Sequence, residues 1–180
     1  VYGIGGSPEN GLFYFDEESN EVKRTSSDYE KPQCSACFIL GLEDKMFGDN
    51  SITDWWHTEA RLFKHGSGSG VTLQYLRAIG ESLSGGGQSS GAQSFAKVSD
   101  QIADVVKSGG ITRRAAKMVV QSVNHPEVVP FIDWKVDSEK QVRALVASGL
   151  YTPKEAYTHV SGQNSNNSIR VHDDFMNAVN

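Results

Sequence analysis

Two cysteines three positions apart have the clearest chemical potential in this sequence. Cys34 and Cys37 form a single C-x-x-C pattern immediately before an apolar run at 38–40. Such a pair is typical of half a zinc site, of a thioredoxin-type dithiol, or of two thiols without a joint function. A zinc site needs two more ligands and the five histidines are scattered, so we predict no metal site. The dithiol and structural alternatives both remain open at this point.

Glycine-rich and basic segments form a second group with chemical potential. Residues 66–70 (GSGSG) fit either a phosphate-binding loop or a tight turn between a helix and a strand. Residues 84–91 fit a flexible linker or a mobile functional loop. Residues 107–114 fit a phosphate-binding segment or a solvated basic loop, because arginine suits bidentate phosphate contacts. Their concentration in an otherwise acidic chain favours a site for an anionic nucleotide.

Composition sets the broad class. The chain has 180 residues, 38% of them hydrophobic, and a net charge of −5. We therefore predict a soluble globular protein without a membrane span, and without the clustered basic face that nucleic acid or an anionic membrane requires. Two cysteines indicate a reducing, cytoplasmic compartment. Because the sequence begins at Val1 and stops inside an apolar helix that starts near Asp173, we expect a piece of a larger protein.

The elements that must position these residues alternate between strands and helices, which predicts an α/β fold. Expected strands are an N-terminal hairpin near 12–20, a buried strand at 37–40, and strands at 71–76 and 118–120. Expected helices are 51–63, capped by Ser51, and 95–106. A third helix is expected to begin at His125 and Pro126, and a separate amphipathic stretch follows at 138–148. Two more are expected, one with a capping box at 152–155 and one from 173. Residues 163–168 are expected to be a loop, His125 a structural cap, Trp55 a core residue and Trp56 a helix-surface residue.

Six motifs occur in a fixed order along the chain. They are PQCSACFI (32–39), LFKHGSGSG (62–70), LSGGGQSSG (83–91), KSGGITRRAA (107–116), HPE with FIDWK (125–127 and 131–135) and QNSNNSIRV (163–171). As an ordered set they resemble the catalytic subunit of ribonucleotide reductase, most closely its class II, adenosylcobalamin-dependent branch. The resemblance covers essentially the whole sequence.

The resemblance implies a partial ten-stranded α/β barrel with reduction of ribonucleotides by a thiyl-radical mechanism. Residues 1–180 would be one partial domain, with an N-terminal hairpin and loop at 1–33 and barrel strands, effector loops and helices at 34–180. Cys37 resembles the first of two reducing cysteines that form a disulfide. Ala36 and Gly68 resemble substrate-contacting positions. Cys34 has no counterpart that we can assign, so the two cysteines need not act together.

An allosteric site for deoxynucleoside triphosphates is also implied. Asp44 resembles the acid that holds the effector deoxyribose, and Arg77 resembles the arginine on the effector phosphates. Residues 80–91 resemble the first specificity loop. The second specificity loop, with Lys107, Arg113 and Arg114, lies at 107–114. Ser84 stands near the place of another basic residue of the family, which weakens that one phosphate contact.

Other family segments are absent from this sequence. The Asn-Pro-Cys-x-Glu segment with the radical cysteine is missing, as is the disulfide partner of Cys37. The chain alone is therefore not expected to reduce nucleotides, and adenosylcobalamin is expected to bind mainly to other parts of the enzyme. Expected partners are the ribonucleotide substrate, dNTP or ATP effectors, the remainder of the reductase and a second copy of the chain, but neither nucleic acid nor a membrane. The alternatives are a non-catalytic nucleotide-binding or regulatory module and a C-x-x-C thiol redox protein.

Overall fold

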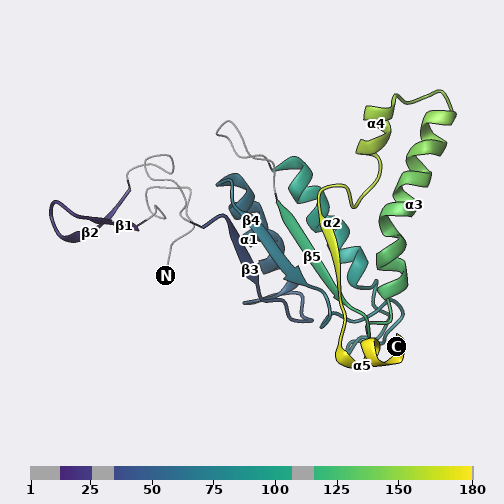
Figure 1. Cartoon of the computed structure of the whole chain (residues 1–180), viewed down its shortest axis with the longest axis horizontal. Helices are drawn as coiled ribbons and strands as arrows, with labels where there is room; N and C mark the ends of the chain where they lie inside the picture. Colours follow the sequence, from purple (N-terminus) through teal and green to yellow (C-terminus); the bar gives the residue numbers. More distant parts are fainter. Residues whose placement is uncertain (1–12, 26–34, 107–115, 180) are drawn as a thin grey trace.

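The computed structural model describes residues 13–25, 35–106 and 116–179. Within these ranges the chain forms a small hairpin and a four-stranded parallel sheet with helices (Figure 1). The strands are β1 (Phe13–Asp16), β2 (Glu21–Arg24), β3 (Cys37–Leu40), β4 (Gly68–Thr72), β5 (Lys117–Ser122) and β6 (Asn166–Arg170). The helices are α1 (Ile52–Lys64), α2 (Ala92–Val105), α3 (Val128–Ala147), α4 (Pro153–Thr158) and α5 (Asp173–Val179).

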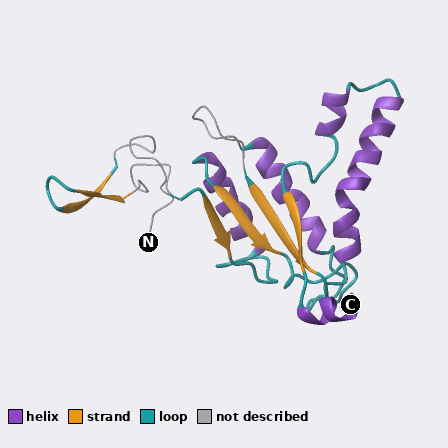
Figure 2. Cartoon of the chain, viewed as in Figure 1, coloured by secondary structure: helices purple, strands orange, loops and turns teal. Residues whose placement is uncertain are grey.

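The parallel sheet has the strand order β3-β4-β5-β6, which is also the order along the chain. Helix α1 connects β3 to β4, α2 leads from β4 towards β5, and α3 and α4 precede β6. The helices α1, α2 and α3 lie on one face of this sheet (Figure 2). An unbroken sequential order is typical of an α/β barrel, whereas a doubly wound sheet reverses its order at a switch point. The predicted α/β class and partial barrel are thus confirmed.

The two faces of the sheet differ in burial. Side chains alternate between the faces of a strand, and Val71 and Val119 are buried towards the helices. On the opposite face Ile39 is 94% exposed and Met118 is 46% exposed. The expectation that 37–40 is a buried strand is therefore wrong for half of its residues, because the described residues cover only one face of the sheet.

The hydrophobic core lies between the sheet and the helices. It joins residues before, within and after the segment 66–91, namely Leu42, Ile52, Trp55, Val71, Leu73, Leu76, Ala92, Ala96, Val119, Phe131 and Trp134. Trp55 is 1% exposed, as expected of a core residue. Trp56 packs against the core instead of lying on the surface, and its ring nitrogen donates a 3.2 Å hydrogen bond to the Phe95 carbonyl.

Several local predictions are confirmed by the element boundaries. The hairpin forms with β1 and β2 antiparallel, and β5 contains the predicted strand at 118–120. Ser51 caps α1 by accepting a hydrogen bond from the backbone N–H of Asp54 at 3.1 Å. Thr152 and Glu155 form the complete capping box of α4. Of the helices formed by the described residues, none is long and apolar enough to cross a membrane.

Three expected boundaries are wrong. The strand expected at 71–76 is β4, at Gly68–Thr72, because its backbone pairs with β3 from Gly68 onward. The segment 163–168 is not all loop, since β6 begins at Asn166, where β5 provides a pairing strand. The helix expected from Pro126 and the separate stretch at 138–148 form one helix, α3, because no helix-breaking residue separates them.

Candidate functional site

Cys37 lies at the amino end of β3 with an exposed, free thiol. It stands in register with Gly68 of the neighbouring strand, and the Gly68 N–H donates a 2.6 Å hydrogen bond to the Ala36 carbonyl. The structure thus brings together all three residues predicted to contact substrate. Cys37 shares the open side of β3 with Ile39, whereas Phe38 and Leu40 are half-buried towards the helices. The thiol is therefore accessible from the uncovered face of the sheet.

Gly68 leaves no room for a side chain beside this thiol. A Cβ at Gly68 would lie 2.9 Å from Cys37 Sγ and 2.6 Å from the Ala116 carbonyl oxygen. The same carbonyl accepts a 2.9 Å hydrogen bond from the Ser69 N–H, so it belongs to the pairing of β4 with the start of β5. Three strand ends therefore meet at the amino edge of the sheet, with the smallest residue at their centre.

Replacing Gly68 by Ala is expected to reduce the free energy of unfolding by about 1–3 kcal/mol, because the added methyl group overpacks a site bounded by backbone. The displaced sulfur is also expected to change the rate at which iodoacetamide alkylates Cys37. Urea unfolding and alkylation, both in a Cys34→Ser background, measure the two effects. Gly70→Ala is the matched control, since a Cβ at Gly70 meets nothing within 4 Å. Equal effects of the two substitutions would contradict the close approach at Gly68.

Asp44 and Arg77, two of the residues proposed for the effector, lie at the opposite edge of the sheet from Cys37. Asp44 follows β3 and Arg77 follows β4, and carboxyl ends of parallel strands share one edge. The Arg77 Nε donates a hydrogen bond to the Asp44 carboxylate, and the Arg77 Nη1 donates a second hydrogen bond to the Ser82 carbonyl at 3.2 Å. Two small cavities adjoin this pair, one of about 490 Å³ beside Asp44 and one of about 370 Å³ beside Arg77; Tyr75 lines both. The structure therefore places an arginine and a carboxylate together at a hollowed edge.

The predicted helix start at His125 and Pro126 is wrong, and a buried hydrogen-bond chain explains why. Helix α3 begins at Val128 with Glu127 as its N-cap. The Glu127 carboxylate instead accepts a 2.7 Å hydrogen bond from the Ala92 N–H at the start of α2. His125 Nδ1 accepts the Glu127 N–H at 3.1 Å, which leaves Nε2 to donate to the Leu76 carbonyl at 2.9 Å. His125 is thus a structural residue, as expected, and HPE connects the loop after β4 to α2.

Gly91 completes this connection. Its φ is +87°, and a Cβ there would lie 2.3 Å from a Glu127 carboxylate oxygen. Only glycine adopts this backbone without strain and admits the carboxylate. The segment 84–91 therefore ends in a fixed position at Gly91. An isolated antiparallel bridge also pairs Gln88 of this segment with Ser82.

A buried polar cluster beneath the sheet was not anticipated from the sequence. The Glu59 carboxylate and the Lys117 ammonium lie 2.9 Å apart, and both side chains are 0% exposed. Glu59 also accepts hydrogen bonds from Ser69, at 2.7 Å, and from Ser99. Burial lowers the pKa of Lys117 below 10.5, and the Glu59 carboxylate acts in the opposite direction. The cluster joins α1, β4, α2 and β5 directly behind the edge that carries Cys37.

The remaining predicted site residues lie outside the described ranges. These are Cys34, Lys107, Arg113 and Arg114, so the C-x-x-C pair and the second specificity loop stay predictions. The phosphate-loop alternative for 66–70 is wrong, because Gly68 and Gly70 are strand residues and the Gly68 N–H is used in strand pairing. The described residues contain no group of three or more His, Cys, Asp or Glu side chains able to hold a metal ion.

The sequence is similar to known proteins over most of its length. Residues 35–180 match the profile of the ribonucleotide reductase barrel domain. The vitamin B12-dependent ribonucleotide reductase of Agrobacterium fabrum is 38% identical over 249 aligned positions, which cover 99% of this chain and 20% of the relative. The enzyme of the same name from Streptomyces clavuligerus is 48% identical over 149 positions, which cover 82% of this chain and 15% of the relative.

A solved structure has the same fold. The alpha subunit of the class Id ribonucleotide reductase of Actinobacillus ureae superposes with a TM-score of 0.57 at 15% sequence identity. The match covers 86% of this chain and 24% of that subunit. The chain thus spans about a fifth of the length of the Agrobacterium relative and about a quarter of the subunit of known structure.

Proposed function

The chain belongs to the ribonucleotide reductase barrel-domain family, and we propose that it is the part of a cobalamin-dependent reductase that carries one redox cysteine and the allosteric specificity site. In this proposal the complete enzyme reduces ribonucleotides to deoxyribonucleotides in the cytoplasm. The 180 residues form one partial domain of its barrel, and the remainder of the reductase covers the open face of the sheet. The isolated chain is inactive, because it lacks the radical cysteine and the partner of Cys37.

The observation that carries this proposal is the exposed Cys37 thiol at the amino edge of the sheet, in register with Gly68. In the complete enzyme Cys37 and a second thiol outside this chain form a disulfide. The two thiols thereby supply the two electrons and two protons that replace the 2′-hydroxyl group by hydrogen and release water. Ala36 and Gly68 position the nucleotide, since the missing side chain at Gly68 allows a ligand to approach the backbone closely.

The described residues do not form a site for the cobalamin cofactor itself. The sheet face beside Cys37 is open, with Ile39 94% exposed, so it encloses nothing the size of a corrin ring. We therefore assign adenosylcobalamin to other parts of the enzyme. This chain's contribution is the thiol and its surroundings.

The Asp44–Arg77 edge is proposed to bind the effector. A nucleoside triphosphate offers a sugar hydroxyl to the carboxylate and phosphate oxygens to the guanidinium, and charge-assisted hydrogen bonds of this kind are strong. Lys107, Arg113 and Arg114 are proposed to add contacts from the second specificity loop. A homodimer is proposed as the assembly in which this site operates.

A chimeric enzyme tests the proposed function. Residues 34–180 would replace the matching segment of the Agrobacterium reductase, so that the chimera carries both cysteines, and deoxynucleotide formation would be measured with adenosylcobalamin and a dithiol. Retained, effector-sensitive reduction is expected. A folded chimera that binds nucleotides but forms no deoxynucleotide would contradict the proposal. The isolated 180-residue chain serves as the inactive control.

A further inference from the structure

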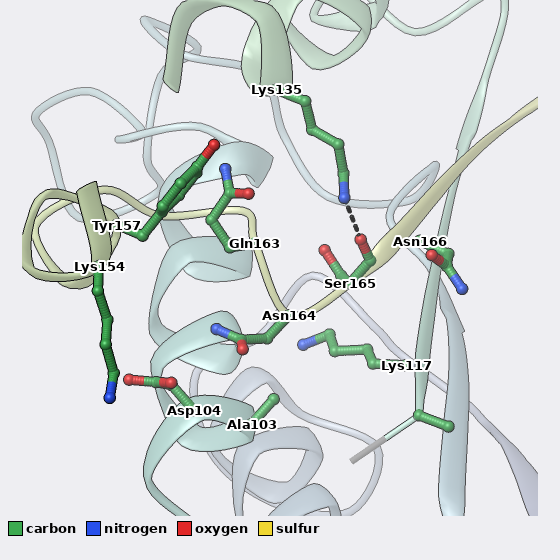
Figure 3. Close-up of a pocket in the computed structure, with 11 residues that line it drawn as sticks. Ala103, Asp104, Lys117, Lys135, Lys154, Tyr157, Gln163, Asn164, Ser165 and Asn166 are labelled. Carbon is green, nitrogen blue, oxygen red and sulfur yellow. Dashed lines mark hydrogen bonds between the residues drawn. The ribbon is translucent and has the colours of Figure 1, made fainter. Parts of the chain in front are cut away.

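A cavity of about 660 Å³ has no role in the proposed function. It lies on the helix side of the sheet, among the end of α2, helices α3 and α4, and the residues that lead into β5 and β6 (Figure 3). Its volume is within the range of about 300–1,000 Å³ that is usual for small-molecule sites. Neither Cys37 nor the Asp44–Arg77 pair lines it.

The charged groups of this cavity are mostly cationic. Lys117, Lys135 and Lys154 line it, against the single carboxylate of Asp104. Lys117 is already paired with Glu59 behind the wall. Within the described ranges neither Lys135 nor Lys154 forms an ion pair, which leaves two uncompensated ammonium groups on α3 and α4.

Several neutral polar groups accompany these lysines. Gln163, Asn164, Ser165 and Asn166 line the cavity on the segment that enters β6 (Figure 3). The Lys135 ammonium donates to the Ser165 carbonyl at 2.5 Å, which fixes its position and leaves two of its three protons for a ligand. Amide and ammonium groups together are donors suited to an oxyanion.

A fully buried carboxylate holds this wall in place. Asp100 is 0% exposed and accepts hydrogen bonds from the backbone N–H groups of Gly162, at 2.6 Å, and Asn164, at 3.0 Å. Gly162 has a φ of +86° and packs against the Trp134 ring, which any Cβ would approach to 2.8 Å. The segment that lines the cavity is therefore preorganised by α2 and α3, and a ligand need not order it on binding.

We propose that this cavity binds a phosphate-bearing anion, with Lys135 and Lys154 providing the charge and the 163–166 segment providing neutral hydrogen bonds. The polar lining favours a polyphosphate group over an apolar ligand. Asp104 opposes the anion and limits its affinity. The site is separate from the proposed effector edge, so neither proposal depends on the other.

Calorimetric titration of the 180-residue chain with pyrophosphate tests the proposal. Lys135→Gln and Lys154→Gln are each expected to weaken binding by about five- to tenfold, the loss of one charge-assisted contact. Asp104→Asn is expected to tighten binding by about two- to fivefold, because it removes the opposing charge. Lys140→Gln is the matched control on α3, since this exposed lysine pairs with Asp137 and does not line the cavity, and it should leave binding unchanged.

Weaker pyrophosphate binding in the two lysine variants, together with tighter binding in Asp104→Asn, distinguishes a binding role of these residues from a structural role. Circular dichroism verifies that each variant is folded. Should Lys135→Gln unfold, Lys154→Gln and Asp104→Asn still carry the test. No saturable binding by the folded chain, or an equal loss in Lys140→Gln, would overturn the proposal. Titrations in an Arg77→Ala background identify the source of the anion: competition by a deoxynucleoside triphosphate indicates a nucleotide, and its absence indicates free polyphosphate.

Discussion

Replacing Cys37 by Ser is expected to abolish multiple turnover in the chimeric enzyme while leaving effector binding unchanged. A hydroxyl group cannot form the disulfide that supplies the two electrons, and Asp44 and Arg77 lie at the other edge of the sheet. Deoxynucleotide formation over many turnovers, together with calorimetric titration of the effector, measures both parts of this expectation.

Cys34→Ser is the matched control for this substitution. Cys34 has no assigned counterpart in the family, so its replacement should leave turnover near that of the parent enzyme. Sustained turnover in Cys37→Ser would remove the redox role from this residue. Equal losses in the two variants would instead favour a dithiol made by the C-x-x-C pair.

The second large effect concerns the buried pair of Glu59 and Lys117. Replacing Lys117 by Met is expected to reduce the free energy of unfolding by about 3–5 kcal/mol, because it leaves the Glu59 charge buried with only hydroxyl partners. Both side chains are 0% exposed, so water cannot compensate for the lost ammonium group. Urea unfolding of the 180-residue chain, followed by circular dichroism, measures the change.

A double variant separates the buried charge from the lost packing. Glu59→Gln combined with Lys117→Met removes the unpaired charge and retains an acceptor for Ser69 or Ser99. Its free energy of unfolding is expected to exceed that of Lys117→Met alone by more than about 1 kcal/mol, because the effects of substitutions at two residues in contact do not add. Additive losses in the double variant would contradict a direct interaction between the two side chains.

Local sequence signals predicted the starts of α1 and α4, but not the extent of α3. Ser51 begins α1 and the Thr152–Glu155 capping box begins α4, because both caps depend on neighbours within a few residues. The pairing partner of a strand lies far away in the sequence, which is why β4 and β6 were misplaced. The glycines of β4 and the asparagines of β6 are residue types typical of loops. They form strands here because the neighbouring strands provide their hydrogen-bond partners.

The candidate site was predicted only through the ordered motifs. Spacing alone offered a C-x-x-C pair whose joint function stayed open, and Cys34 lies outside the described residues. The neighbour that the structure does show, Gly68 on the next strand, has no local signal in the sequence. The role of Glu127 at the start of α2 spans 35 positions and has no local signal. Glu59 had one available signal, an acidic residue within the buried face of α1, but its partner Lys117 lies 58 positions away.

Calorimetric titration of the 180-residue chain with the four deoxynucleoside triphosphates tests most sharply whether Asp44 and Arg77 form the specificity site. Saturable binding to the parent chain is expected to be lost in Arg77→Ala and retained in the control Arg143→Ala, on the exposed surface of α3. Because the cavity beside Lys135 and Lys154 is itself proposed to bind phosphate-bearing anions, the decisive comparison is made in chains that carry Lys135→Gln and Lys154→Gln. Nucleotide binding that survives Arg77→Ala in that background, or no binding by a folded parent chain, would contradict the assignment of the specificity site to these residues.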